Sequence, residues 1–296
     1  MKRKVFVKKY PQEFLPTLHN AIESTFNGKF EQKPTSSDYE FSRFTAPHSV
    51  LVLYKSGKVV LIHKGMEEVE DFLISFIPEK EYDVMVGLDE TGKGELFGNI
   101  VLCGVRIEKL KVEIEKVVSS FNTKNRVSFA RYEELFETLK RLGVRFVVKE
   151  IEPNKLKPKK MNHLLFKGYL SILEELEVDL SKGKSVRIVL DDFGVSRKML
   201  ETLRSKYYFA ELVVKYGADD EYLECKTASL VSKYFREKHI EEINRKYLLD
   251  GVGPGDGNLS DPHTKEWLRK WVLLHGSLPP FVKKWEKVLR WLDEKR

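Results

Sequence analysis

The chain has 296 residues, 42% of them hydrophobic, which is enough for one large domain with its own core and a smaller one. Its net charge of +7 at pH 7 suits a polyanionic partner, and with only Cys103 and Cys225 the fold does not rest on a disulfide framework. No apolar run is long enough to span a bilayer, and residues 1–10 alternate like a strand and do not resemble a signal peptide, so we expect a cytoplasmic protein without a membrane partner.

The first 80 residues have the pattern of a separate α+β unit. Strand signals at residues 4–7, 30–32, 39–44, 50–54 and 58–63 are interrupted by a helical segment at 14–26 and followed by another at 67–77. Residues 78–81, Pro-Glu-Lys-Glu, have the composition of a linker. We therefore predict an N-terminal domain over residues 1–80 and a second domain over residues 81–296.

The second domain alternates strands and helices after an initial hairpin. The hairpin strands are predicted at residues 84–88 and 100–106, and further strands at 144–149, 186–190 and 212–216. Helices are predicted at residues 109–119, 128–142, 162–176, 221–246, 264–274 and 282–292. This order predicts a mixed sheet flanked by helices.

Three apolar strands of this domain run into acidic residues. The acids are Asp89 with Glu90, Asp191 with Asp192, and, after Gly217 and Ala218, Asp219 with Asp220. Open α/β sheets place ligand sites at the carboxyl ends of their strands, where such a cluster would hold two Mg²⁺ or Mn²⁺ ions for phosphodiester chemistry. Taken alone, Asp89 and Glu90 also fit a solvated strand end followed by a turn.

Several motifs, in order, resemble one family. Residues 89–94, Asp-Glu-Thr-Gly-Lys-Gly, are similar to the first catalytic motif of the type 2 ribonucleases H, the group that contains ribonucleases HII and HIII. Asp191 stands where the family has its third carboxylate, and Ala218-Asp219 followed by Ala228-Ser229 resembles the fourth acid and its helix. Residues 255–257, 260–262 and 264–268 resemble the closing segment of the family.

The resemblance implies a ribonuclease H-like fold and an enzyme that cuts the RNA strand of RNA/DNA hybrids endonucleolytically, leaving 5′-phosphate and 3′-hydroxyl ends. It implies two divalent ions, Mg²⁺ or Mn²⁺, held by Asp89, Glu90, Asp191 and Asp219, with Asp192 and Asp220 as alternatives to their neighbours. It further implies substrate contacts from Gly92, Lys93, Gly94 and Lys124, the last of which resembles the Lys of the family's Asp-Ser-Lys triplet. The expected partner is an RNA/DNA hybrid duplex, and we expect a monomer without an obligate protein partner.

The two branches of the family differ at both ends of the chain. Ribonuclease HIII carries an N-terminal domain similar to half of the TATA-box-binding protein, and residues 1–80 resemble its order of strands and helices. Ribonuclease HII has Arg where this chain has Lys93, and a junction-reading Tyr where this chain has Asn258. The segment from Ser260 to Val282, however, looks more like archaeal and eukaryotic ribonuclease HII.

Three hypotheses follow from these features. The first is a ribonuclease HIII that cuts extended hybrids. The second is a ribonuclease HII-like enzyme that incises at single ribonucleotides in duplex DNA. The third, of another class, is a non-catalytic hybrid-binding protein, against which the presence of all four acids argues.

Overall fold

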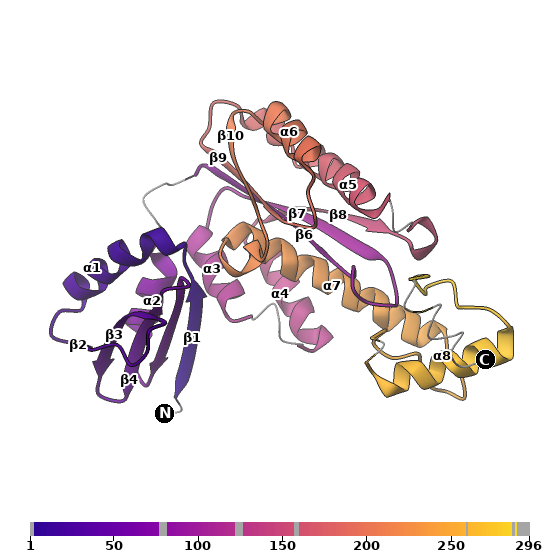
Figure 1. The fold of residues 1–296 in the computed structure, drawn as a ribbon, viewed down its shortest axis with the longest axis horizontal. Helices are drawn as coiled ribbons and strands as arrows, with labels where there is room; N and C mark the ends of the chain where they lie inside the picture. Colours follow the sequence, from indigo (N-terminus) through magenta and orange to yellow (C-terminus); the bar gives the residue numbers. More distant parts are fainter. Residues whose placement is uncertain are drawn as a thin grey trace. The chain divides into compact units, whose positions relative to one another are not determined.

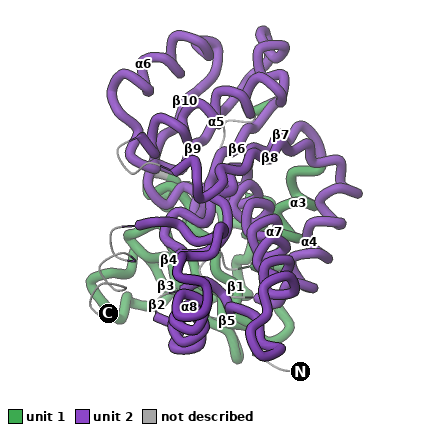
Figure 2. Tube along the Cα trace, turned by 90° about the vertical axis from the view of Figure 1, so that its right-hand side faces the viewer, with its two compact units in different colours: residues 1–82, 110–122 green, residues 83–109, 123–296 purple. Residues whose placement is uncertain are grey.

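The computed structural model describes residues 3–76, 82–121, 127–156, 160–258, 260–285 and 288. Its contacts divide the chain into two compact units, which Figure 2 shows in different colours. The N-terminal unit comprises residues 1–82 and 110–122, and the larger unit comprises residues 83–109 and 123–296. The predicted linker at 78–81 and Lys124 lie outside the described residues.

The N-terminal unit is a five-stranded antiparallel sheet with helices (Figure 1). Its strands have the order β1-β5-β4-β3-β2. Side chains of α1 and α2 form one hydrophobic cluster with alternate residues of the strands, so both helices cover the same face of the sheet. The elements are β1 (Lys4–Lys9), α1 (Leu15–Thr25), β2 (Glu31–Lys33), β3 (Glu40–Ala46), β4 (Ser49–Tyr54), β5 (Lys58–His63), α2 (Glu67–Ser75) and α3 (Lys111–Ser119).

Helix α3 joins the N-terminal unit although it follows the first hairpin of the larger unit in the chain. Lys116 Nζ lies 3.2 Å from Asp71 Oδ1 of α2, and Lys8 Nζ of β1 lies 3.2 Å from Glu115 Oε1. A single boundary near residue 80 therefore does not describe the division of the chain.

The larger unit is built on a mixed five-stranded sheet of order β10-β9-β6-β7-β8. Strand β6 runs parallel to β9, which runs parallel to β10, whereas β7 is antiparallel to both β6 and β8. The elements are β6 (Val84–Thr91), β7 (Ile100–Ile107), α4 (Phe129–Arg141), β8 (Arg145–Ile151), α5 (Met161–Glu175), β9 (Val186–Asp191), α6 (Arg197–Lys206), β10 (Ala210–Lys215), α7 (Leu223–Lys246) and α8 (Pro262–His275).

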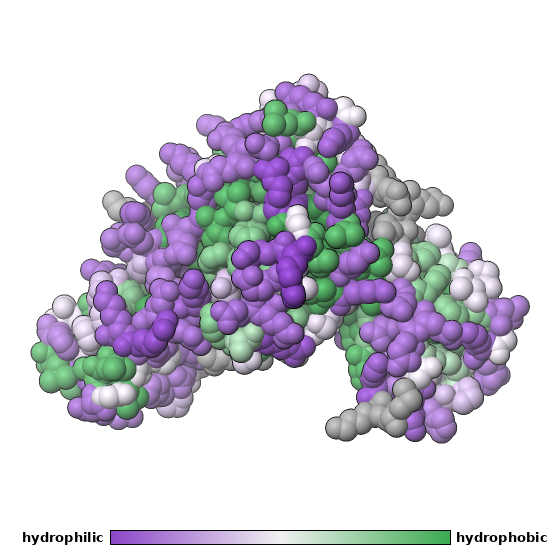
Figure 3. Space-filling model, turned by 180° about the vertical axis from the view of Figure 1, so that it is seen from behind, coloured by the Kyte–Doolittle hydropathy of each residue, from purple (hydrophilic) through white to green (hydrophobic). Residues whose placement is uncertain are grey.

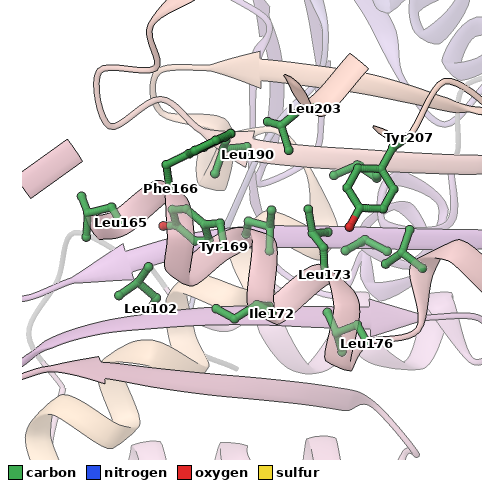
Figure 4. Packing of buried hydrophobic residues seen from close by; sticks show 14 of the residues in the cluster. Leu102, Leu165, Phe166, Tyr169, Ile172, Leu173, Leu176, Leu190, Leu203 and Tyr207 are labelled. Atoms are coloured by element: carbon green, nitrogen blue, oxygen red, sulfur yellow. The ribbon is translucent and has the colours of Figure 1, made fainter. Parts of the chain in front are cut away.

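Helices α5 and α7 pack on opposite faces of this sheet. Figure 4 shows the α5 face, where Tyr169 and Ile172 of α5 lie against Leu102 of β7. On the other face, α7 comes so close to β6 that a Cβ on Gly87 would lie 2.1 Å from the carbonyl carbon of Glu224. Glycine at this position is what permits the contact, and it fixes the height of α7 over the strand that carries the acids.

Two segments differ from the sequence-based expectation. Helix α6 was not among the predicted elements, although Ser196 caps it by accepting a hydrogen bond from the Met199 N–H. The helix predicted at 282–292 does not begin at Val282, because residues 282–285 are not helical and Val282 pairs with Phe97 as an isolated bridge. Residues 286–287 and 289–296 lie outside the described part.

Hydrophilic residues cover most of the face shown in Figure 3, as expected for a chain with 33% charged residues. Among the described residues, no helix combines the length and the apolar character needed to cross a membrane.

Candidate active site

Asp89 lies on the face of β6 that packs against α7. Side chains alternate along a strand, so Asp89 points to the same face as Gly87 and meets α7 five residues after Glu224. The carboxyl is buried, with 6% of the residue exposed, and accepts a hydrogen bond from the Ser229 side chain. Burial raises its pKa well above the usual range; the charge of Glu90 adds to this, and the bond from Ser229 opposes it.

Glu90 points to the opposite face, toward α5. Its Oε2 accepts a hydrogen bond from the Tyr169 hydroxyl, and its Oε1 lies 4.0 Å from Lys93 Nζ. Burial raises the pKa of Glu90 to about 7, while the hydrogen bond from Tyr169 and the charge of Lys93 lower it. Two acids adjacent in the sequence thus occupy different environments.

Asp191 lies at the end of β9, next to β6 in the sheet. Its Oδ1 accepts a hydrogen bond of 2.8 Å from the Ala218 N–H. Burial raises the pKa of Asp191, and its charge in turn raises the pKa of both Asp89 and Glu90. Asp191 is therefore close to the acids on both faces of β6.

The neighbouring Asp192 makes its hydrogen bonds within the turn that follows β9. Its Oδ1 accepts hydrogen bonds of 2.8 Å from the N–H groups of Gly194 and Val195 and so holds the turn after β9. Asp192 thus holds the local turn, while its charge, like that of Asp191, raises the pKa of Glu90.

Asp219 follows β10, in the short 3₁₀ turn η5 (Ala218–Asp220). Its charge raises the pKa of both Asp89 and Asp191, which places it beside the cluster. The same turn supplies the Ala218 N–H to Asp191. The three strand ends thus bring Asp89, Glu90, Asp191 and Asp219 together at one edge of the sheet.

The charge of this cluster fits a divalent ion. Burial and neighbouring carboxylates raise the pKa of Asp89, Glu90 and Asp191, so a cation would stabilise their charged forms, and hard oxygen ligands favour Mg²⁺ or Mn²⁺. Within the described residues, no three His, Cys, Asp or Glu side chains are arranged to surround one ion. Mg²⁺ in nucleotide sites commonly takes one or two carboxylates and completes its shell with water and substrate phosphate oxygens. The chain therefore fits an ion that it shares with its substrate.

The loop of residues 92–98, called here the substrate loop, joins β6 to β7 beside the acids. Gly92 has φ +89°, and a Cβ there would lie 2.6 Å from the Asn99 carbonyl oxygen. Lys93 Nζ donates a 2.8 Å hydrogen bond to the Phe193 carbonyl oxygen, which ties the loop to the turn after β9. A Cβ on Gly94 would meet no atom within 4 Å, so this part of the loop is open.

Two further residues were named from the sequence as substrate contacts or as a difference between the branches of the family. Lys124 lies outside the described residues. Asn258 is exposed, and its side-chain oxygen accepts a hydrogen bond of 3.0 Å from the Ser260 N–H.

Sequence reasoning did not identify two residues that contact the acids. Tyr169 hydrogen bonds Glu90 from α5, and no local pattern marks it, because the contact depends on how α5 crosses the sheet. Ser229 was recognised only as part of a resembling motif. Lys233, one turn later on α7, donates a 3.0 Å hydrogen bond to Ser229 Oγ and so extends the polar contacts behind Asp89.

Comparison with known proteins gives consistent results for most of the larger unit. The family profile described as Ribonuclease HII matches residues 86–287. Ribonuclease HII of Thermococcus sibiricus is 28% identical over 211 residues, which cover 71% of this chain and 91% of that protein. The structure of ribonuclease H2 from Pyrococcus horikoshii is 25% identical, with a TM-score of 0.57, and the match covers 72% of this chain and 98% of that one.

One solved structure extends the likeness to nearly the whole chain. Bst-RNase HIII in complex with Mn²⁺ has a TM-score of 0.53 at 16% identity, and the match covers 92% of both chains. At this identity the likeness concerns the fold alone. Together with the Pyrococcus structure, it confirms the predicted fold of the larger unit, a mixed sheet flanked by helices.

Proposed function

The chain belongs to the ribonuclease HII family and is a ribonuclease H, and from this premise we propose that it hydrolyses the RNA strand of RNA/DNA hybrids with two divalent ions. The observation that carries the proposal is the convergence of Asp89, Glu90 and Asp191 on the adjacent strands β6 and β9, where burial and the charge of Asp191 raise the pKa of both Asp89 and Glu90. A cluster of neighbouring acids destabilises the fold, so its presence indicates a functional site. Binding of divalent cations and of a phosphate group is the function that such a site supports.

Asp89, Glu90, Asp191 and Asp219 would hold the ions. When bound, a pair of divalent ions activates a water molecule and stabilises the leaving 3′-oxygen of a phosphodiester. The role of the surrounding residues is to hold the acids in position by hydrogen bonds. Ser229 holds Asp89 from α7, Tyr169 holds Glu90 from α5, and the Ala218 N–H holds Asp191.

The substrate loop would read the ribose. Selectivity for RNA over DNA requires a contact with the 2′-hydroxyl, and the space at Gly94, where a Cβ would meet no atom within 4 Å, leaves room for a ribose beside the loop. The Lys93 side chain is held by the Phe193 carbonyl and lies beside Glu90.

The N-terminal unit favours the ribonuclease HIII branch, which cuts extended hybrids. The Thermococcus and Pyrococcus relatives match over 91% and 98% of their own lengths yet cover 71% and 72% of this chain. We propose that the N-terminal unit, which residues 1–80 form together with α3, is a substrate-binding domain of the TATA-box-binding-protein type. Its helices cover one sheet face, and on β1 the other face carries Val5 and Val7, 65% and 44% exposed.

The ribonuclease HII-like alternative, incision at single ribonucleotides in duplex DNA, is favoured by the match of residues 86–287 to that family. The two activities are separated by incubating the protein with Mg²⁺ or Mn²⁺ and two labelled duplexes, one an RNA/DNA hybrid and one DNA with a single ribonucleotide. Cleavage of the hybrid alone supports the HIII-type proposal, and cleavage of both supports the alternative. Asp89→Asn serves as the control, and equal cleavage by this variant would refute the assignment of the acids.

The role of the N-terminal unit has its own test. Val5→Asp with Val7→Asp would place two negative charges on the open face of the sheet, and Thr17→Asp with Ser24→Asp, at exposed positions of α1, is the control matched in charge. We expect a higher KM for the hybrid with kcat nearly unchanged in the double variant only. An unchanged KM would refute the substrate-binding role of this face.

A further inference from the structure

Lys283 is fully buried, with 0% of the residue exposed, in a segment without regular secondary structure. An ammonium group is retained in such a place only where oxygen acceptors replace its hydration. Lys283 Nζ donates hydrogen bonds to the carbonyl oxygens of Phe97 at 3.0 Å and Glu95 at 3.2 Å. Both acceptors belong to the substrate loop.

Backbone contacts reinforce this connection. The Lys283 N–H donates to the Leu96 carbonyl at 2.9 Å, and the Gly98 N–H donates to the Phe281 carbonyl at 2.9 Å. Trp285 Nε1 adds a longer hydrogen bond of 3.4 Å to the Glu95 carbonyl. Residues 281–285 therefore run along the second half of the substrate loop and hold it by its backbone.

The loop is thus anchored on both sides of Gly94. Lys93 binds the Phe193 carbonyl at the beginning, and Lys283 binds the carbonyls of Glu95 and Phe97 at the end. Gly94 lies between the two anchors, with no atom within 4 Å of the position that its Cβ would take. The position of this backbone relative to the acids depends on both lysines.

We propose that Lys283 is a positioning residue for substrate recognition: its ammonium sets the backbone of the substrate loop at Glu95 and Phe97, and thereby the discrimination between an RNA/DNA hybrid and a DNA duplex. The inference rests on the proposed function of that loop. It assigns this selectivity in part to a C-terminal segment about 190 residues away in the chain.

The test uses the full-length protein in EDTA, so that binding is measured without cleavage. Lys283→Met keeps the length of the side chain and removes the ammonium, Lys283→Arg keeps a cationic donor, and Lys284→Met, at the exposed neighbour, is the matched control. Dissociation constants are measured for an RNA/DNA hybrid and for a DNA duplex of the same sequence. We expect Lys283→Met to weaken hybrid binding about tenfold and DNA binding less than about twofold, because the lost hydrogen bonds fix the loop that meets the 2′-hydroxyl.

Further readouts separate positioning from stability. With metal present, Lys283→Met should raise KM for the hybrid more than it lowers kcat, and Lys283→Arg should recover part of the loss. If Lys283→Met does not fold, Trp285→Phe serves instead, because it removes only the hydrogen bond from the indole N–H to the Glu95 carbonyl. It should shift the ratio of the two dissociation constants, hybrid to DNA, in the same direction but by less. A wild-type ratio in Lys283→Met, or an equal loss for both duplexes, would overturn the inference. A wild-type protein that does not prefer the hybrid would instead overturn the proposed function.

Discussion

Replacing Glu90 with Gln should stabilise the metal-free protein at neutral and alkaline pH. Glu90 is buried between Tyr169 and Lys93, and its pKa in the folded protein is about 7, above the ordinary value of 4.5. A carboxyl whose pKa is raised by folding binds its proton more tightly in the native state. Its contribution to stability is therefore most favourable below pH 4.5 and is lost as the pH rises through 7.

The magnitude follows from this shift. A rise of the pKa from 4.5 to about 7 corresponds to about 3 kcal/mol of lost stability once Glu90 is ionised. Glutamine carries no charge and keeps an oxygen for the Tyr169 hydroxyl, and the pKa of about 7 already includes the stronger hydrogen bond that the charged carboxylate accepts from Tyr169. Glu90→Gln should thus be about 3 kcal/mol more stable than the wild type at pH 8, and nearly equal to it at pH 4.

The assay is denaturant unfolding in EDTA at pH 4, 6 and 8, with the exposed Glu241→Gln on α7 as the control for loss of one negative charge. Adding Mg²⁺ or Mn²⁺ at pH 8 should stabilise the wild type more than the variant and close the gap, because the ion compensates a charge that the variant lacks. A gap that is absent at pH 8, or that is equally large at pH 4, would refute the explanation by burial of Glu90.

Three more substitutions test the supports of the site. Gly87→Ala should lower the stability by about 1–3 kcal/mol, because its Cβ would overlap the Glu224 carbonyl, and an unchanged urea midpoint would contradict this packing. Glu224 is 0% exposed and accepts two hydrogen bonds, of 2.7 and 3.0 Å, from Arg187, so Glu224→Ala should lower the free energy of unfolding by about 3–5 kcal/mol. The double variant Glu224→Leu with Arg187→Met should recover most of this loss, because it leaves no unpaired charge. A double variant as unstable as the single one would argue against the ion pair as the cause. Tyr169→Phe removes the hydrogen bond that lowers the pKa of Glu90, so the acidic limb of the pH profile of kcat/KM should move to higher pH. An unchanged acidic limb would show that Tyr169 does not influence the catalytic protonation of Glu90.

The sequence was sufficient to predict the strands that carry the acids. Apolar runs followed by acids place Asp89 and Asp191 at the ends of β6 and β9, and the structure pairs these strands side by side. Local pattern could do this because a buried strand and a polar strand end differ in composition over a few residues. It could not choose between Asp191 and Asp192, which differ only in which N–H groups they meet.

Contacts between segments that are distant in the chain could not be predicted from local sequence patterns. Tyr169 reaches Glu90 because Gly104 of β7 gives α5 room, where a Cβ would lie 2.2 Å from Ile172. Lys283 was expected in a helix, since residues 282–292 have a helical pattern. The structure instead uses its backbone and its ammonium to hold the substrate loop, and this depends on a partner about 190 residues earlier.

The alternation of side chains along β6 explains how the adjacent residues Asp89 and Glu90 come to lie in different environments. Asp89 faces α7 and Glu90 faces α5, so each carboxyl is tuned by a different helix, through Ser229 in one case and Tyr169 in the other. Asp191, on the neighbouring strand, influences both and joins the two faces into one cluster. A change in either helix should therefore alter one acid first, and the other through the direct charge interaction of Glu90 with Asp89 and through Asp191. For this reason Tyr169→Phe should affect the protonation of Glu90 while leaving the Ser229 contact of Asp89 intact.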